Sequence, residues 1–166
     1  PGSPMNYSLR PETAAAFKDK TVLLTGSAGF LGKHFVSALG GGCSVVRMDP
    51  AENSLDASKA GDWRSYGHDE IECGYRNADL VIYAAGIASP SHYHARPLAA
   101  LDASVAGIRN ALEYCKQHGA RLLFLSSSEI YGDPPASHVP TLESYRGSVS
   151  CRGPRACYDE SKRLAE

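Results

Sequence analysis

The sequence predicts a doubly wound α/β fold, in which helices cover both faces of a parallel sheet. Short runs rich in β-branched residues alternate along the chain with longer segments of helical periodicity, the pattern of repeated strand–helix units. The strand-like runs are continuously apolar, as in strands that are buried on both faces. A length of 166 residues suits one domain, and shares of 43% hydrophobic and 21% charged residues are those of a globular protein.

Five segments are expected to form strands. The first ends at a glycine and the second at an Asp-Pro pair, both of which interrupt regular structure. In chain order the expected strands are Thr21–Thr25, Ser44–Met48, His68–Ile71, Asp79–Ala85 and Arg121–Ser126. Between the second and third strands, residues 50–68 are polar and leave room for one short helix.

Three longer helices are expected. The segment Phe30–Leu39 ends at three consecutive glycines, which stop a helix. The segment Pro97–His118 carries apolar residues at helical spacing and ends at Gly119. A last helix begins near Arg155, after a long irregular loop over residues 127–150.

The chain divides by composition into three parts. Residues 1–5 resemble the remnant of an expression tag, residues 6–19 form an N-terminal extension, and residues 20–166 form the α/β domain. The last helix stops after about two turns with neither a cap nor a breaker. We therefore interpret the chain as an N-terminal fragment, truncated before its last strands and its substrate domain, and expect the fragment alone to be inactive.

Charge and cysteine content narrow the possible partners. Seventeen basic and eighteen acidic residues give a net charge of −1 with no basic stripe, which argues against nucleic acid and anionic membranes as partners. The longest apolar runs are too short to span a bilayer. Five cysteines without a C-x-x-C pair or a signal peptide indicate a cytoplasmic protein. His92 and His94 have no Cys or carboxylate at ligand spacing, so no metal site is predicted.

A glycine-rich turn lies between the first strand and the first long helix. It reads Gly26-Ser27-Ala28-Gly29-Phe30-Leu31-Gly32. Glycines at such a turn allow the backbone to approach a pyrophosphate, which then sits on the helix N-terminus. Tight turns also need glycine for purely structural reasons, but the strand–turn–helix context favours a dinucleotide-binding (Rossmann) domain.

Asp49 follows the second strand and indicates which dinucleotide binds. A carboxylate at this place can accept hydrogen bonds from the adenine ribose hydroxyls and would repel a 2′-phosphate, which favours NAD over NADP. Two alternatives stay open. Asp49 could be a turn or capping residue, and Arg47 on the same face of the strand could accommodate a phosphate.

Two further motifs carry groups for acid–base chemistry. Tyr158 and Lys162 are four residues apart on one helix face, where a lysine ammonium favours the phenolate form of a tyrosine. Ser127 and Glu129 follow the fifth strand, at the edge where parallel sheets bind ligands. Each motif alone is equally typical of an exposed helix face or a polar turn, and the order of all the motifs along the chain supports the catalytic interpretation.

Together these motifs resemble the extended short-chain dehydrogenases/reductases, the NAD-dependent sugar-nucleotide epimerases and dehydratases. The resemblance covers residues 20–166 and is most specific to the UDP-glucuronate decarboxylases. It rests on the segments 88–93 (ASPSHY), 128–134 (SEIYGDP) and 153–163 (GPRACYDESKR). Family members often form homodimers by pairing the helix at Pro97–His118 with the one near Arg155, so a homodimer is implied.

The resemblance implies a reaction that oxidises and then restores the sugar. Tyr158, assisted by Lys162, removes the proton of the 4-hydroxyl while C4 passes its hydride to NAD, and Ser127 holds the 4-oxygen. The resulting 4-keto uronic acid loses carbon dioxide with assistance from Glu129, and NADH returns the hydride, which converts UDP-glucuronate to a UDP-xylose-like product.

The motifs and the resemblance together give two sets of binding residues. The cofactor is expected to contact Gly26, Ala28, Gly29, Phe30, Leu31, Gly32, Asp49, Asp69, Ala85, Gly86, Tyr158 and Lys162. The nucleotide sugar is expected to contact Ser89, Tyr93, Ser127, Glu129 and Arg155.

Two alternatives share this fold. The first is a 4-epimerase or 4,6-dehydratase acting on another nucleotide sugar, since both reactions also begin with oxidation at C4. The second is a catalytically inactive module that binds NAD or a nucleotide sugar. Glu129, next to the full segment 153–163, favours decarboxylation, and intact Tyr158 and Lys162 argue against an inactive module.

Overall fold

The computed structural model describes residues 9–49 and 78–166, which form two compact units. The first unit is described over residues 9–49, 78–85 and 110–124 and contains the sheet. The second contains residues 86–109 and 125–166.

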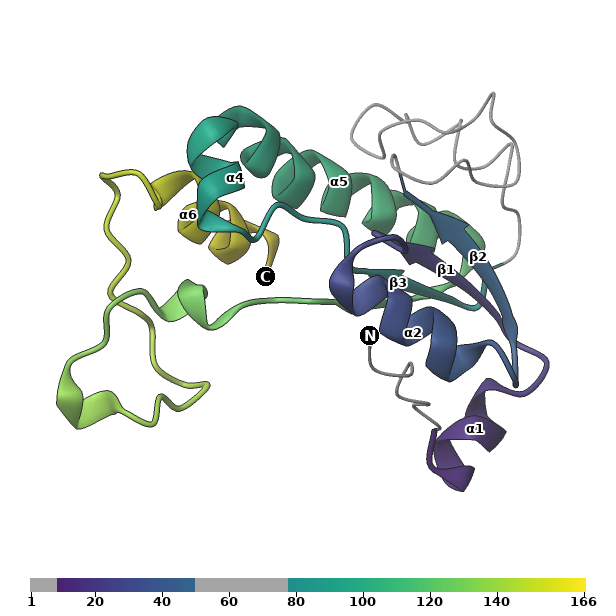
Figure 1. Cartoon of the computed structure of the whole chain (residues 1–166). Helices are drawn as coiled ribbons and strands as arrows, with labels where there is room; N and C mark the ends of the chain where they lie inside the picture. Colours follow the sequence, from purple (N-terminus) through teal and green to yellow (C-terminus); the bar gives the residue numbers. More distant parts are fainter. Residues whose placement is uncertain (1–8, 50–77) are drawn as a thin grey trace, which may run out of the picture. The chain divides into compact units, whose positions relative to one another are not determined.

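The sheet of the first unit has four parallel strands in the order β2-β1-β3-β4. Strands β2, β1 and β3 are labelled in Figure 1. They are β1 (Thr21–Thr25), β2 (Ser44–Met48), β3 (Leu80–Tyr83) and β4 (Arg121–Phe124). The chain leaves β1 to form β2 on one side and later forms β3 on the other side. The carboxyl ends of β1 and β3 are therefore a topological switch point, where sheets of this kind bind ligands.

Helices flank this sheet because alternate strand residues point to opposite faces. On one face, buried Val22, Leu24 and Ile82 form a cluster with Leu39 of α2 (Phe30–Leu39), against which Phe17 of α1 (Pro11–Phe17) packs. Ala111 and Tyr114, from the C-terminal half of α5 (Pro97–His118), are also fully buried. The Tyr114 hydroxyl accepts a hydrogen bond of 3.1 Å from the Ala78 N–H. Burying each aliphatic side chain contributes about 1.5–3 kcal/mol.

The second unit is built from short elements around a small aromatic core. Its helices are α4 (Pro90–Ala95), residues 97–109 of α5, and α6 (Ala156–Ala165). Two 3₁₀ turns, η1 (Ser128–Tyr131) and η2 (Ala136–His138), lie in the intervening loop. Buried Tyr93, Ala100 and Tyr158 form the core. No helix in the described ranges combines the length and the apolar character that crossing a membrane requires.

The expected fold class is confirmed, as are the bounds of β1, β2, α2 and α5 and the start of α6. The last two expected strands end two residues early, and the backbone groups that follow them bond elsewhere. After β3, the Ala85 N–H donates to the Thr25 hydroxyl oxygen at 3.1 Å instead of continuing the ladder. After β4, the Leu125 carbonyl accepts from Lys162 Nζ at 2.8 Å.

Other differences concern the short elements. Helix α4 was not expected, because its six residues have no apolar periodicity and only Tyr93 is buried. The loop over residues 127–150 is less irregular than expected, since it contains η1 and η2. The expected strand at 68–71, the short helix within 50–68 and the cofactor residue Asp69 lie outside the described residues.

Candidate cofactor and catalytic sites

The glycine-rich turn of the first unit has the geometry that the sequence predicts. Gly26 has a φ of +68°, and a Cβ at this position would lie 2.7 Å from the Ala84 carbonyl oxygen. A Cβ at Gly32 would overlap the Gly26 carbonyl oxygen. Both positions therefore exclude any larger residue, and the turn brings the start of α2 directly against the end of β1.

The N-terminus of α2 is open to an anion. Its capping residue is Gly29, which has no side chain that could accept a hydrogen bond from the first-turn N–H groups. Phe30 is 80% exposed and Leu31 is 51% exposed. Unsatisfied N–H groups and the positive end of the helix dipole together favour a phosphate at this place.

Asp49 and Ala85 lie around the same turn. The Asp49 Oδ2 atom accepts a hydrogen bond of 3.1 Å from the Ala28 N–H, so the carboxylate at the end of β2 reaches the glycine-rich turn. A carboxylate can accept several hydrogen bonds, and ribose hydroxyls are donors that it can accept from. Ala85 is held by the buried Thr25 hydroxyl across the switch point. The turn, Asp49 and Ala85 thus form one candidate nucleotide site within the first unit.

In the second unit, Tyr158 and Lys162 lie one turn apart on α6. The Tyr158 ring stacks almost parallel on Tyr93, with ring centroids 5.2 Å apart and an interplanar angle of 9°. Lys162 is 6% exposed, and burial lowers the pKa of its ammonium against an opposing effect of Glu166. Its Nζ donates to the Leu125 carbonyl, and a Cβ on Gly86 would be 3.9 Å from Nζ. The phenol and the ammonium are therefore both held by buried contacts.

Ser127 and Glu129 lie at the start of η1. The Ser127 hydroxyl oxygen caps this turn by accepting a hydrogen bond of 3.3 Å from the Glu129 N–H. Its proton is left available for donation to a ligand. The cap fixes the backbone that carries Glu129, so the two candidate catalytic groups of this segment are positioned by the same local structure.

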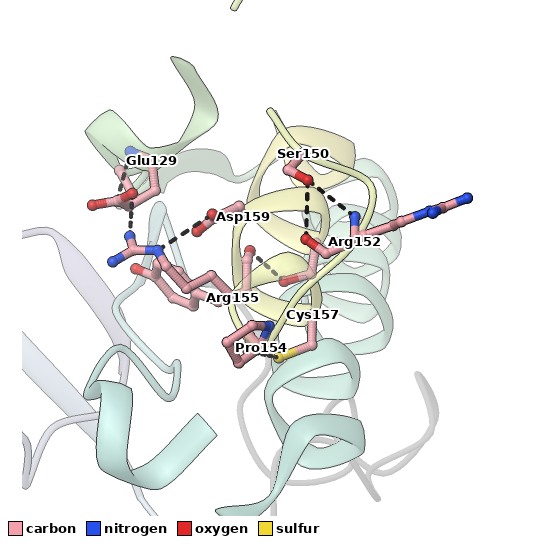
Figure 2. Close-up of polar contacts among 10 residues, drawn as sticks. Glu129, Ser150, Arg152, Pro154, Arg155, Cys157 and Asp159 are labelled. Carbon is pink, nitrogen blue, oxygen red and sulfur yellow. Dashed lines mark hydrogen bonds and ion pairs between the residues drawn. The ribbon is translucent and has the colours of Figure 1, made fainter. Parts of the chain in front are cut away.

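Arg155 links Glu129 to α6. Its Nη2 atom forms an ion pair with Glu129 Oε2, and its Nε atom lies 3.5 Å from Asp159 Oδ2 (Figure 2). The carboxylates of Glu129 and Asp159 together raise the pKa of Arg155, and the Glu129 contribution is the larger. Burial raises the pKa of Asp159, while Arg155 opposes that shift. These three residues line one pocket of about 470 Å³.

Within the second unit, four of the predicted substrate residues lie in the contacts described above, and the fifth, Ser89, does not. Tyr93 contacts Tyr158, and Arg155 contacts Glu129. Ser89 is exposed, and its hydroxyl pairs with Ser91 Oγ at 3.0 Å, without a described contact to these residues. Sequence reasoning missed Asp159, although its position four residues after Arg155 on a helix could have indicated the ion pair.

Comparisons with known proteins identify the family to which the chain is similar. The family model that matches residues 22–166 is described as the NAD dependent epimerase/dehydratase family. A curated relative, UDP-glucuronic acid decarboxylase 1 of Xenopus tropicalis, is 38% identical over 156 residues, or 89% of this chain and 36% of that protein. This chain therefore spans little more than a third of that relative's length.

Two solved structures are similar in fold and in sequence. UDP-N-acetylglucosamine 4-epimerase of Methanobrevibacter ruminantium M1, in complex with UDP-N-acetylmuramic acid, has a TM-score of 0.72 and 25% identity, with 90% of this chain and 49% of that chain covered. UDP-glucose 4-epimerase of Thermus thermophilus, in complex with NAD, has a TM-score of 0.67 and 26% identity, covering 87% and 48%.

Proposed function

The chain belongs to the NAD-dependent epimerase/dehydratase family, and from that premise we propose that the protein oxidises C4 of UDP-glucuronate and decarboxylates it to a UDP-xylose-like product. The observation that carries the proposal is the arrangement of α6 and η1. A buried tyrosine and lysine share a unit with Glu129, whose carboxylate is held by Arg155. The similarity to a UDP-glucuronic acid decarboxylase supports the same substrate.

NAD is the cofactor that the first unit fits. Gly26 and Gly32 leave space that a Cβ would fill, and the open N-terminus of α2 suits a pyrophosphate. The Asp49 carboxylate at the turn suits ribose hydroxyls and disfavours a 2′-phosphate. When bound, NAD supplies the acceptor, and later the donor, of the C4 hydride.

Tyr158 acts as the base in the proposed first step and takes the proton of the sugar 4-hydroxyl. Lys162 stabilises the negative charge that develops on the phenol, since its ammonium is buried on the same helix face. Ser127 donates its hydroxyl proton to the sugar 4-oxygen, which fixes the reacting carbon. Lys162 is itself fixed by the Leu125 carbonyl.

Glu129 serves the second part of the reaction. Oxidation at C4 gives a β-keto acid, whose C5–carboxylate bond breaks so that carbon dioxide leaves and the electron pair enters the C4 carbonyl as an enolate. The enolate then needs a proton at C5. Glu129 lies two residues after Ser127 in the same capped turn, and relays this proton from solvent to C5, which regenerates its carboxylate.

A 4-epimerase or 4,6-dehydratase is the second candidate. The matched structures from Methanobrevibacter ruminantium and Thermus thermophilus are both 4-epimerases of UDP-sugars, and these reactions would use Tyr158 and Lys162 in the same first step. Epimerisation needs no acid at C5, whereas 4,6-dehydration needs an acid–base group near C5 and C6. The Glu129–Arg155 pair therefore favours decarboxylation over epimerisation, and the mass of the product separates decarboxylation from dehydration.

The product decides between these candidates. The protein, expressed to the full length that its gene encodes, is incubated with UDP-glucuronate and NAD, and the product is weighed by mass spectrometry. We expect a product lighter by one carbon dioxide, and none with Tyr158→Phe. Recovery of all sugar at unchanged mass would refute decarboxylation and direct the test to other nucleotide sugars.

We also propose that the protein is a homodimer formed through α5 and α6. Leu98 of α5 and Leu164 of α6 are 75% and 71% exposed, and apolar side chains this exposed on helices often lie in interfaces. Light scattering on the full-length protein is expected to give twice the monomer mass. A cytoplasmic location stays a prediction from the cysteine pattern.

A further inference from the structure

We infer that Asp159 is a positioning residue for Glu129, because its carboxylate holds the Arg155 guanidinium in the orientation that pairs with Glu129. The inference rests on the proposed function, in which Glu129 manages the proton of the decarboxylated sugar. Asp159 itself is not expected to touch the substrate.

The geometry of Arg155 links the two carboxylates. Its Nη2 engages Glu129 from one side, while its Nε lies 3.5 Å from Asp159 Oδ2 on the other (Figure 2). A guanidinium is rigid and planar, so restraining Nε also sets the direction of Nη2. A change at Asp159 is therefore expected to reach Glu129 through Arg155.

Burial makes Asp159 the fixed member of the three. Its side chain is 11% exposed, whereas those of Arg155 and Glu129 are 47% and 35% exposed. An ion pair between two partly exposed side chains samples many orientations and contributes little to stability. Asp159 lies in the first turn of α6, where the helix dipole also favours a carboxylate. It can therefore anchor a guanidinium that would otherwise move.

The second carboxylate oxygen argues for a role in the site. Asp159 Oδ1 is buried without a hydrogen-bond partner among the described residues. Burying a carboxylate with an open oxygen opposes folding, and burial also raises the pKa of Asp159. The described ion pair of Asp159 is with Arg155. The pairing is therefore best explained by what it does to Arg155.

The charge balance also separates this role from substrate binding by Arg155. One guanidinium faces two carboxylates, so the three residues carry a net negative charge when all are ionised. Such a group is poorly suited to attract the carboxylate of a uronic acid. Arg155 is better suited to orient Glu129 than to bind the substrate, in contrast to the role that the sequence resemblance implies.

The test compares Asp159→Asn with Glu160→Gln in the full-length enzyme. Both changes remove one negative charge from neighbouring residues of α6, but Glu160 is exposed. Because misplacing a catalytic group strongly reduces turnover, we expect Asp159→Asn to lower kcat for UDP-glucuronate by about tenfold or more with KM nearly unchanged. Glu160→Gln is expected to retain the wild-type kcat.

A double-mutant cycle shows whether the effect passes through Glu129. In a Glu129→Gln background, Asp159→Asn is expected to cause no further loss of kcat, because the group that it positions is already gone. A kcat for Asp159→Asn equal to that of Glu160→Gln, or a full additional loss in the Glu129→Gln background, would overturn the inference.

A readout without turnover separates this inference from the proposed function. The nitrogen-15 NMR signal of Arg155 Nε–H is expected to shift in Asp159→Asn and to remain in place in Glu160→Gln. If the wild-type enzyme releases no carbon dioxide, the proposed function fails, but the NMR signal of Arg155 still tests the positioning role. An unchanged signal in Asp159→Asn overturns that role. If Asp159→Asn does not fold, Arg155→Gln breaks the same link between Asp159 and Glu129. If Arg155→Gln lowers kcat as much in the Glu129→Gln background as in the wild type, the positioning role of Asp159 is overturned.

Discussion

Gly32 illustrates how one missing Cβ determines the start of α2. A methyl group at this position would overlap the Gly26 carbonyl oxygen, so Gly32→Ala must move backbone rather than a flexible side chain. We expect the free energy of unfolding to fall by about 1–3 kcal/mol. Chemical denaturation measures this loss. Gly41→Ala is the control, because a Cβ there meets nothing within 4 Å, and equal losses in both variants would contradict the account.

Tyr158→Phe separates the chemistry of this residue from its packing. The phenylalanine ring retains the stack on Tyr93, so stability is expected to change little, while loss of the hydroxyl removes the proposed base. Removing such a group typically lowers turnover by about 10²–10⁴-fold. Steady-state kinetics checks this expectation against Tyr145→Phe, which lies outside the candidate site. Turnover of Tyr158→Phe within a factor of a few of wild type would exclude Tyr158 as the base.

At the residue scale, the spacing of residues in the sequence predicts which side chains share one helix. It predicts less well which residues of different elements are in contact. Tyr158 and Lys162 are predicted to lie on one helix from their four-residue spacing, and in the structure both lie on α6, where both are also buried. The partner of Lys162 is a backbone carbonyl at Leu125, which has no side-chain signature in the sequence. The roles of the site residues stay predictions until the variants are measured.

Asp79 joins the starts of two neighbouring strands. Its carboxylate accepts hydrogen bonds of 2.8 Å from Lys20 Nζ and from the Thr21 N–H. The bond from Lys20, followed by that from Thr21, lowers the pKa of Asp79. A carboxyl whose pKa is lower in the folded state stabilises the fold above its unfolded pKa of about 3.9, and this contribution is lost as the pH falls through the folded value.

We therefore expect Asp79→Asn to be less stable than wild type at neutral pH and to lose less stability on acidification. Denaturation at a series of pH values tests this. The exposed Asp102 on α5 provides the control, as Asp102→Asn. A pH dependence of Asp79→Asn identical to that of Asp102→Asn would show that Asp79 does not contribute in this way.

The elements that were predicted correctly are those with a strong local signal. Helix α2 ends at a glycine run and α5 at Gly119, and both have the predicted bounds. Helix α4 starts at a proline and buries only Tyr93, so the sequence shows no repeat of apolar residues that would predict a helix there. After β3 and β4, Ala85 bonds to Thr25 and Leu125 bonds to Lys162, and bonds between residues so far apart in the sequence leave no local pattern.

For the whole molecule, binding of the cofactor is expected to raise the free energy of unfolding. A ligand that binds only the folded state at a concentration 100 times its Kd adds about 2.7 kcal/mol to the free energy of unfolding. We expect NAD to raise the melting temperature of the full-length protein more than NADP does, because Asp49 lies at the glycine-rich turn. Thermal denaturation checks this. Asp49→Ser is expected to reduce the difference between the melting temperatures measured with NAD and with NADP. Equal stabilisation by NADP would instead favour phosphate binding near Arg47.

The motifs also predict the family correctly, because they depend on the order of short segments rather than on overall composition. The family match over residues 22–166 confirms the resemblance, and the sheet order confirms the fold class. Choosing among decarboxylation, epimerisation and dehydration requires more of the substrate site, and the chain spans about half or less of the length of the proteins that it matches.

Oxidation of the sugar at C4 is tested most directly by following hydride transfer from C4 to NAD. Full-length protein with bound NAD is mixed with UDP-glucuronate that carries deuterium at C4, while NADH absorbance is followed and the product is analysed by mass spectrometry. We expect transient NADH absorbance and a decarboxylated product that retains the deuterium. Binding of the sugar without any NADH signal, or loss of the deuterium to solvent, would contradict oxidation at C4 and favour a protein that binds these ligands without converting them.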